Sequence, residues 1–296
     1  MTAHHEEHEH EHDLGLHHDL GTLERRGLSR RMGRRGVLGV LGGLSVVAVA
    51  GCAEDSTSTS TSSSTAPSSG PGGAPGGAMG GDSSVEVAEG EIPEETAGPY
   101  PGDGSNGPNV LTESGVVHSD ITTSFGSASG VADGVPLTLH FKVYDLTGDD
   151  VEVMAGAAIY AWHCDRDGAY SMYDGDAVDE NYLRGVQESD ADGWVEFTTV
   201  FPGCYAGRWP HVHFEVYESL DAATSASNKL RTSQLAFPQD VCETVYATTG
   251  YESSVANLSQ VSLDSDGIFS DGYSLQMATT KGSVTDGYTA TLNVPI

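Results

Sequence analysis

Residues 201–217 read FPGCYAGRWPHVHFEVY, and the last seven of them decide the fold class. Side chains of an extended strand point alternately to opposite faces, so His211 and His213 share one face and Val212 and Phe214 share the other. The apolar pair predicts a strand with one face in a hydrophobic core. The histidine pair predicts that two imidazoles on the opposite face can reach one metal ion.

The rest of the chain has the pattern of a β-rich domain. Alternating or continuous apolar runs are separated by Gly, Asp and Asn turns, as is typical of strands in a sheet. We therefore predict an all-β fold, a single β-sandwich domain with one or two short helices, one of them running from Pro238 to near Gly250. The predicted strands lie at residues 135–146, 157–164, 193–200, 211–217, 231–237 and 288–296.

The sequence divides into three parts. Residues 92–296 are numerous enough for one domain with a substantial core. Residues 53–91 are rich in Ser, Gly and Pro, so they cannot bury such a core and predict a flexible linker. Residues 1–52 contain an export signal, preceded by a histidine-rich tract at 4–18. We interpret that tract as a leader extension removed with the signal, with metal storage as the alternative.

The export signal has a recognisable order of parts. Two arginine pairs, at 30–31 and 34–35, precede an uncharged stretch at 36–50, which is shorter than the ~20 residues needed to span a bilayer. Paired arginines before a weakly apolar stretch predict twin-arginine export. The following Val-Ala-Gly-Cys resembles a lipobox, so Cys52 is predicted to carry a lipid. We expect a lipoprotein on the outer face of the cell membrane, or a secreted protein, with the lipid anchor as its one membrane contact.

The chain is strongly acidic, with a formal net charge of −30. After Cys52, 36 acidic residues face seven basic ones. This balance argues against binding nucleic acid or an anionic membrane surface through charge. It also disfavours highly anionic substrates, unless Arg208 reverses the field locally, and it favours an uncharged substrate.

Three cysteines follow the predicted lipidation site: Cys164, Cys204 and Cys242. Outside the cell one disulfide is expected, and three thiols allow three pairings. We favour Cys204 with Cys242, which would brace the loop that carries Tyr205 against the predicted helix. A zinc site is the alternative, but no cysteine pair has the spacing of a zinc finger.

Three further segments accompany the histidine pair. Upstream, residues 158–174 read AIYAWHCDRDGAYSMYD, an apolar strand that runs through an Asp-Gly turn to Tyr170. Downstream, residues 230–237 read LRTSQLAF and carry Gln234. Before all of them, residues 94–104 read EETAGPYPGDG.

In this order and spacing, residues 96–237 resemble an intradiol ring-cleavage dioxygenase, the family of catechol and protocatechuate dioxygenases. The resemblance covers about half of the chain. It implies a non-haem Fe(III) cofactor, a catechol-type aromatic substrate and O2. The implied iron ligands are Tyr170, Tyr205, His211 and His213.

The same resemblance implies a reaction. The catechol ring would be cleaved between its two hydroxyls, and both oxygen atoms would enter a muconate-type diacid. Tyr205 would leave the metal and act as a base for a catechol proton, Arg208 would stabilise anionic charge on the ring, and Gln234 would orient the intermediate. Pro99 and Tyr100 would line the substrate cleft.

Other interpretations stay open. Tyr170 is a strand-edge tyrosine, Arg208 a surface charge and Gln234 a structural hydrogen-bonding residue in the simplest alternative. Two rival functions are a non-catalytic surface lipoprotein that binds catechols, siderophores or carbohydrate, and a zinc-dependent hydrolase. The loop between Tyr205 and His211 is shorter than in the better-known enzymes, which predicts a more open cleft and leaves the substrate and the oligomeric state undefined.

Several polar residues near these motifs are predicted to be structural. His163 has no counterpart among the implied ligands. Four aspartates in Asp-x-Asp-Gly strings are expected to form tight turns through their side-chain oxygens rather than acid–base pairs. They are Asp165, Asp167, Asp190 and Asp192.

Overall fold

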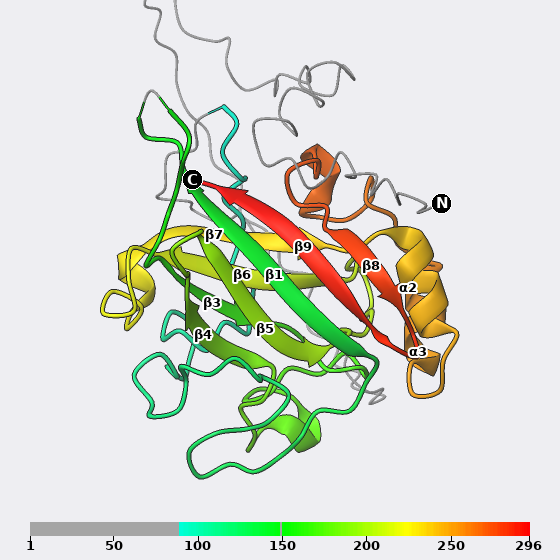
Figure 1. Cartoon of the computed structure of the whole chain (residues 1–296). Coiled ribbons are helices and arrows are strands. Elements are labelled where there is room, and N and C mark those ends of the chain that lie inside the picture. Colours follow the sequence, from blue (N-terminus) through cyan, green and yellow to red (C-terminus); the bar gives the residue numbers. More distant parts are fainter. Residues whose placement is uncertain (1–88, 149) are drawn as a thin grey trace, which may run out of the picture. The chain divides into compact units, whose positions relative to one another are not determined.

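The computed structural model describes residues 89–148 and 150–296 (Figure 1). The predicted export signal, Cys52 and nearly all of the predicted linker lie outside the described residues. The described part contains two sheets and two α-helices. The strands are β1 (Pro136–Asp145), β2 (Glu152–Val153), β3 (Ala158–Trp162), β4 (Arg184–Glu188), β5 (Trp194–Val200), β6 (His211–Tyr217), β7 (Lys229–Ala236), β8 (Thr279–Ser283) and β9 (Gly287–Pro295), and the helices are α2 (Gln239–Tyr246) and α3 (Glu252–Leu258).

The two sheets stack as a sandwich, with β1, β5 and β9 in front of β3, β6 and β7 in Figure 1. In the first sheet β1 pairs with β5 and the short β2 in antiparallel fashion and with β9 in parallel fashion, and β8 extends beyond β9. The second sheet has the order β4-β3-β6-β7 and is antiparallel throughout. The predicted all-β sandwich is therefore confirmed.

Alternation along the strands builds the core between the sheets. In β1 the side chains of Leu137, Leu139, Phe141 and Val143 are buried, while most of their neighbours are partly exposed. The facing strand β6 is buried along its whole length, because the second sheet is covered on both faces. Its Phe214 packs on Phe141, with ring centroids 5.0 Å apart. The prediction that Val212 and Phe214 enter a core is correct.

The predicted helix forms as α2, which is shorter than expected. Helix α2 ends at Tyr246, and the chain turns through Thr248, whose N–H donates to the Val245 carbonyl. Gly250 then adopts a φ of +96°, which an α-helix cannot contain. A second helix, α3, follows immediately. The sequence also gave no sign of β4 or β8, because β4 begins with a buried arginine and β8 is a short polar edge strand.

The predicted disulfide is wrong. Cys164, Cys204 and Cys242 are free, buried thiols in the described residues. Cys204 and Cys242 share the sandwich core, where burial among apolar side chains accommodates a thiol without a crosslink. The Cys204 thiol lies 3.5 Å from the Arg208 carbonyl and donates to it.

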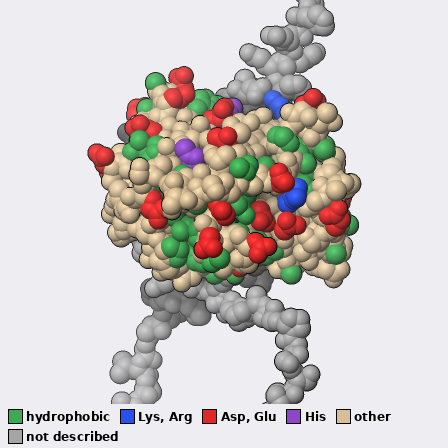
Figure 2. All heavy atoms as spheres, turned by 90° about the horizontal axis from the view of Figure 1, so that it is seen from below, with side chains coloured by type: hydrophobic (Ala, Val, Ile, Leu, Met, Phe, Trp, Pro, Cys, Tyr) green, Lys and Arg blue, Asp and Glu red, His purple; other side chains and the backbone are tan. Residues whose placement is uncertain are grey.

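The surface follows the acidic composition. Figure 2 shows acidic side chains scattered over one face, with few lysines or arginines among them. Within residues 89–296, 32 acidic residues face seven basic ones. No helix in the described part of the chain has the length and apolar character needed to cross a bilayer.

Candidate metal and catalytic site

The outer face of the second sheet carries the predicted histidines. Strand β6 lies between β3 and β7, and its His213 is in register with Trp162 on one side and Gln234 on the other. The Trp162 and His213 rings stack at 5.0 Å, with an angle of 7° between their planes. The two imidazoles are almost fully buried, at 2% exposure for His211 and 3% for His213. Adjacent strands thus hold both rings in fixed orientations.

Two loops bring the predicted tyrosines over this face. After β3 the Asp165 carboxylate accepts hydrogen bonds from the N–H groups of Asp167 and Ala169, both at 2.9 Å, and this turn leads to Tyr170. The loop after β5 is attached to the same turn, because the Gly203 N–H donates to the Asp165 carbonyl at 2.9 Å. That loop carries Tyr205.

The four predicted ligands meet at the Nε2 atom of His211. The Tyr205 hydroxyl lies 3.2 Å from it and the Tyr170 hydroxyl 3.5 Å. The Nε2 atom of His213 lies 3.2 Å away, and an Nη1 atom of Arg208 lies at 3.5 Å. The structure therefore brings together all four residues that the sequence suggested as ligands.

A backbone contact fixes which nitrogen of His211 faces this cluster. Its Nδ1–H donates to the Trp209 carbonyl at 2.5 Å, so Nε2 of the neutral ring keeps its lone pair. A carbonyl behind an imidazole in this way is the usual support of a metal-binding histidine. In His213 the Nδ1 atom is buried and has no hydrogen-bond partner.

Burial sets the charge state of these groups. It lowers the pKa of His211 and of His213 well below 6.5, with the Arg208 charge adding to the effect on both rings. Burial also raises the pKa of Tyr170 well above 10 and that of Tyr205 to about 12. On their own, these four side chains are neutral at pH 7, and the phenols need a nearby positive charge to ionise.

The arrangement fits a cation better than a hydrogen-bond network. One imidazole lone pair accepts one hydrogen bond, so it cannot satisfy four polar atoms within 3.5 Å. In the described residues no three or more His, Cys, Asp or Glu side chains form a metal-binding group. The two tyrosine oxygens are further donors beside His211 and His213, and phenolates suit an oxidised ion such as Fe(III).

The Arg208 guanidinium is held by hydrogen bonds on two sides. Its Nη2 donates to the Oε1 atom of Gln234 at 2.6 Å, and its Nε donates to the Oδ2 atom of Asp266 at 2.9 Å. The sequence suggested Arg208 and Gln234 but missed Asp266. The only local signal was the turn-forming string DSDG at 264–267, which lies 58 residues from Arg208 along the chain.

The segment that carries Pro99 and Tyr100 packs against the cluster. The Tyr100 ring lies 5.1 Å from the rings of both Tyr170 and Tyr173. Gly98 approaches so closely that an added Cβ would stand 3.3 Å from the His213 ring. Pro99 uses its carbonyl to accept a hydrogen bond from Asn106 at 2.7 Å. Tyr100 thus lies beside the four candidate ligands.

The residues predicted to be structural have structural partners. The His163 ring is buried and bonds the Cys164 carbonyl at 2.7 Å and the Thr199 hydroxyl at 2.8 Å. Asp165 and Asp190 each accept two backbone N–H groups within their turns. None of these contacts involves the candidate site.

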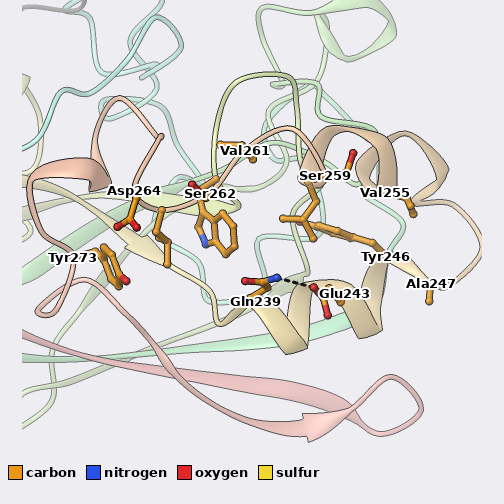
Figure 3. A pocket seen from close by; sticks show the side chains of 13 residues that line it. Gln239, Glu243, Tyr246, Ala247, Val255, Ser259, Val261, Ser262, Asp264 and Tyr273 are labelled. Carbon is orange, nitrogen blue, oxygen red and sulfur yellow. Dashed lines mark hydrogen bonds between the residues drawn. The ribbon is translucent and has the colours of Figure 1, made fainter.

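A separate cavity of about 580 Å³ opens between α2, α3 and residues 259–273 (Figure 3). Trp209 and Tyr246 form part of its lining, and Glu243 and Asp264 supply carboxylates. It shares none of the four candidate ligands. Trp209 lies next to Arg208 in sequence, so the cavity lies behind the site rather than inside it.

Comparison with known proteins gives independent matches. Residues 106–249 match the family described as "Dioxygenase". Catechol 1,2-dioxygenase 1 of Acinetobacter lwoffii is 34% identical over 110 residues, which is 31% of this chain and 34% of that protein. The match therefore spans about a third of the curated relative.

Two solved structures share the fold. An intradiol ring-cleavage dioxygenase from Tetranychus urticae superposes with a TM-score of 0.55 and 22% identity, over 70% of this chain and 94% of that one. A second solved dioxygenase gives a TM-score of 0.52 and 24% identity with the same coverage. At these identities, both similarities concern the fold alone.

Proposed function

We propose that this chain is an intradiol ring-cleavage dioxygenase, which cleaves catechol-type rings between their two hydroxyls with O2. The observation that carries the proposal is the convergence of two tyrosine oxygens and two histidine nitrogens beside Arg208. We propose a non-haem Fe(III) held by Tyr170, Tyr205, His211 and His213. When bound, the ion would act as a Lewis acid that makes the catechol hydroxyls more acidic, and the loss of their protons would make the ring electron-rich.

The protein's own groups have distinct tasks in this proposal. Tyr205 is the less buried of the two tyrosines, so it is the better candidate to turn aside and take a catechol proton on its oxygen. Tyr170 is 2% exposed and held by its turn, so it stays in place. Arg208 cannot lose its proton, and it presents Nη1 to the site as an oriented donor.

The surroundings orient an aromatic substrate. Tyr100 offers a ring edge beside Tyr170, and Gln234 is fixed from both ends of its amide. Its oxygen accepts from Arg208 at 2.6 Å, and its nitrogen donates to the Thr96 carbonyl at 3.0 Å. Because both ends are engaged, Gln234 keeps Arg208 in position rather than acting as a mobile group.

The colour of the protein tests the metal part of the proposal. Purified protein with iron should absorb visible light through tyrosinate-to-Fe(III) charge transfer, and addition of catechol should shift the band. Tyr170→Phe should weaken the band, and His211→Ala should abolish it. A colourless protein that contains one iron per chain would contradict the proposed ligand set.

Oxygen uptake separates an enzyme from a binding protein. Stoichiometric uptake with catechol, lost in the His211→Ala variant, is the expected result. Binding of catechol without uptake would instead favour the non-catalytic surface lipoprotein. Uptake that persists in the variant would contradict the site.

We also propose that the enzyme is exported and anchored by a lipid on Cys52. The support is the order of paired arginines, uncharged stretch and lipobox-like string in residues 30–52, all outside the described residues. Labelled fatty acid should enter the wild-type protein during expression in a bacterial host. A Cys52→Ala variant that takes up the same label would overturn this proposal.

A further inference from the structure

Asp266 is a completely buried carboxylate next to the candidate site, with an exposed fraction of 0%. Its Oδ2 accepts from the Nε of Arg208 at 2.9 Å and from the N–H of Trp209 at 2.7 Å. Its Oδ1 accepts from the N–H groups of Ile268 at 2.8 Å and Phe269 at 3.1 Å. All four contacts come from donors, so both carboxylate oxygens act as acceptors.

This carboxylate holds the whole segment around Arg208. It binds the side chain of Arg208 and the backbone of the next residue, Trp209, whose carbonyl in turn accepts from His211. The contacts of Asp266 with Arg208 and with the Trp209 N–H are charge-assisted hydrogen bonds, which hold this segment firmly. Asp266 lies outside residues 106–249, the region that matches the dioxygenase family.

Asp266 also opposes the charge of Arg208. The guanidinium is mostly buried, at 16% exposure, and it is in direct contact with the Asp266 carboxylate, so the ion pair as a whole carries no net formal charge. Another carboxyl group lies close by: Glu95 interacts with Arg208, Asp266 and Asp271, and it accepts a hydrogen bond from Gln276 at 3.3 Å.

Within the described residues, Arg208 is the one cation whose atoms reach the histidine–tyrosine cluster. Arg184 is another buried cation, at 0% exposure. Its N–H groups already donate to Ser171, to the Tyr160 hydroxyl and to the Pro101 carbonyl. A carboxylate on the substrate ring would therefore lose its hydration in the site, and every cation it could meet there would already have a partner. Such burial of a charge is unfavourable.

We propose that Asp266 is a positioning residue that fixes Arg208 and neutralises it, so that the site takes catechols with uncharged ring substituents and rejects those with a ring carboxylate. The inference rests on the proposed function for the identity of the ring. The acidic composition disfavours anionic substrates unless Arg208 reverses the field locally, and in this proposal the carboxylate of Asp266 prevents that reversal.

A pair of ligands that differ in one charge tests this directly. We would measure anaerobic binding of 3,4-dihydroxybenzoate and of its methyl ester to the full-chain iron protein by calorimetry. The ester should bind at least about tenfold more tightly, which corresponds to roughly 1.4 kcal/mol. Equal affinities, or tighter binding of the acid, would overturn the proposal.

The variant Asp266→Asn tests the residue. Without the negative charge of residue 266, the positive charge of Arg208 should attract the ligand carboxylate. The acid should then bind more tightly, and the ratio of ester affinity to acid affinity should fall by about tenfold. A merely structural defect would not improve binding of one ligand. The exposed Asp264, two residues away on the cavity wall, gives the matched control Asp264→Asn, which should leave the preference unchanged. The same narrowing in both variants would overturn the assignment to Asp266.

The two measurements keep the inference separate from the proposed function. The Asp266→Asn variant should lose stability, because its amide N–H group would face backbone N–H donors. If the variant does not fold, the comparison of acid and ester binding to the wild-type protein still tests the charge selection. Absence of oxygen uptake with every catechol contradicts the dioxygenase activity. Uptake with catechol together with equal binding of acid and ester contradicts the charge selection alone.

Discussion

At the scale of single residues, burial decides which side chains titrate. His163 bonds a carbonyl and a hydroxyl inside the domain, and burial, with a contribution from the Arg184 charge, lowers its pKa to about 4. Glu95 shows the opposite effect, because burial and repulsion from Asp271 raise its pKa to about 7. Each shift makes protein stability depend on pH in a defined direction.

His163 should make the protein less stable in acid. Below pH 6.5 the unfolded histidine binds a proton, whereas the folded one stays neutral to about pH 4, so unfolding is favoured as pH falls through this window. The advantage of wild type over His163→Asn should shrink by about 2 kcal/mol between pH 7.5 and 5. Urea unfolding of both proteins at the two pH values measures this. A constant difference would contradict the depressed pKa.

Glu95 should act in the other direction. Between pH 4.5 and 7 the folded carboxyl holds a proton that the unfolded one has released, so stability falls as pH rises. Glu95→Gln removes this penalty and should raise the melting temperature at pH 8 more than at pH 5. Glu113→Gln, at an exposed position, serves as the control for loss of one charge. An equal gain from both variants at pH 8 would refute the role of burial.

At the scale of elements, one strand serves two purposes. Strand β6 sends Val212, Phe214 and Val216 into the core between the sheets and His211 and His213 into the site. The tyrosines come instead from turns, and the two turns touch. Gly168 has a φ of +90°, and a Cβ there would stand 3.0 Å from that of Tyr205.

Gly168→Ala should therefore damage the site through Tyr205. The strained backbone should cost about 1–2 kcal/mol, and the added methyl should push Tyr205 away from His211. We expect weaker tyrosinate absorption and slower turnover. Gly207→Ala is the control, because its φ of +84° gives similar strain but its Cβ would meet no atom within 4 Å. Equal loss of the absorption band in both variants would point to strain alone.

At the scale of the whole molecule, charge is the dominant feature. Residues 89–296 carry a net formal charge of −25, and Figure 2 shows acidic side chains distributed over the face it draws rather than gathered at one place. Repulsion among like charges destabilises a compact state and is screened by salt. Repulsion among negative charges therefore destabilises the folded state at neutral pH.

Salt should stabilise this protein at neutral pH. Raising NaCl from about 50 to 300 mM shortens the screening length from roughly 14 to 6 Å and should raise the melting temperature by several degrees. The shift should shrink at pH 5, close to the sequence pI of about 4.4, where the net charge is smaller. A salt effect that is equal at both pH values would show that charge repulsion is not its cause.

Much of the fold and of the candidate site could be predicted from local pattern. Apolar runs revealed six of the nine strands in the described residues. Period-two alternation revealed both faces of β6, since side-chain direction in a strand depends on sequence position alone. The Asp-Gly turns and the structural role of His163 also followed. The polar strands β4 and β8, the early end of α2 and the three free thiols did not follow, because each depends on what packs against it.

The sequence by itself determined the sandwich, the residue types of the site and the order in which they occur. Only the tertiary structure decided that Tyr170, Tyr205, His211 and His213 meet at one point, and that Asp266, far along the chain, binds Arg208. Local geometry is a property of neighbouring residues, so sequence can reveal it. Burial and the neutralisation of one charge by another depend on distance through space, which only the folded chain fixes.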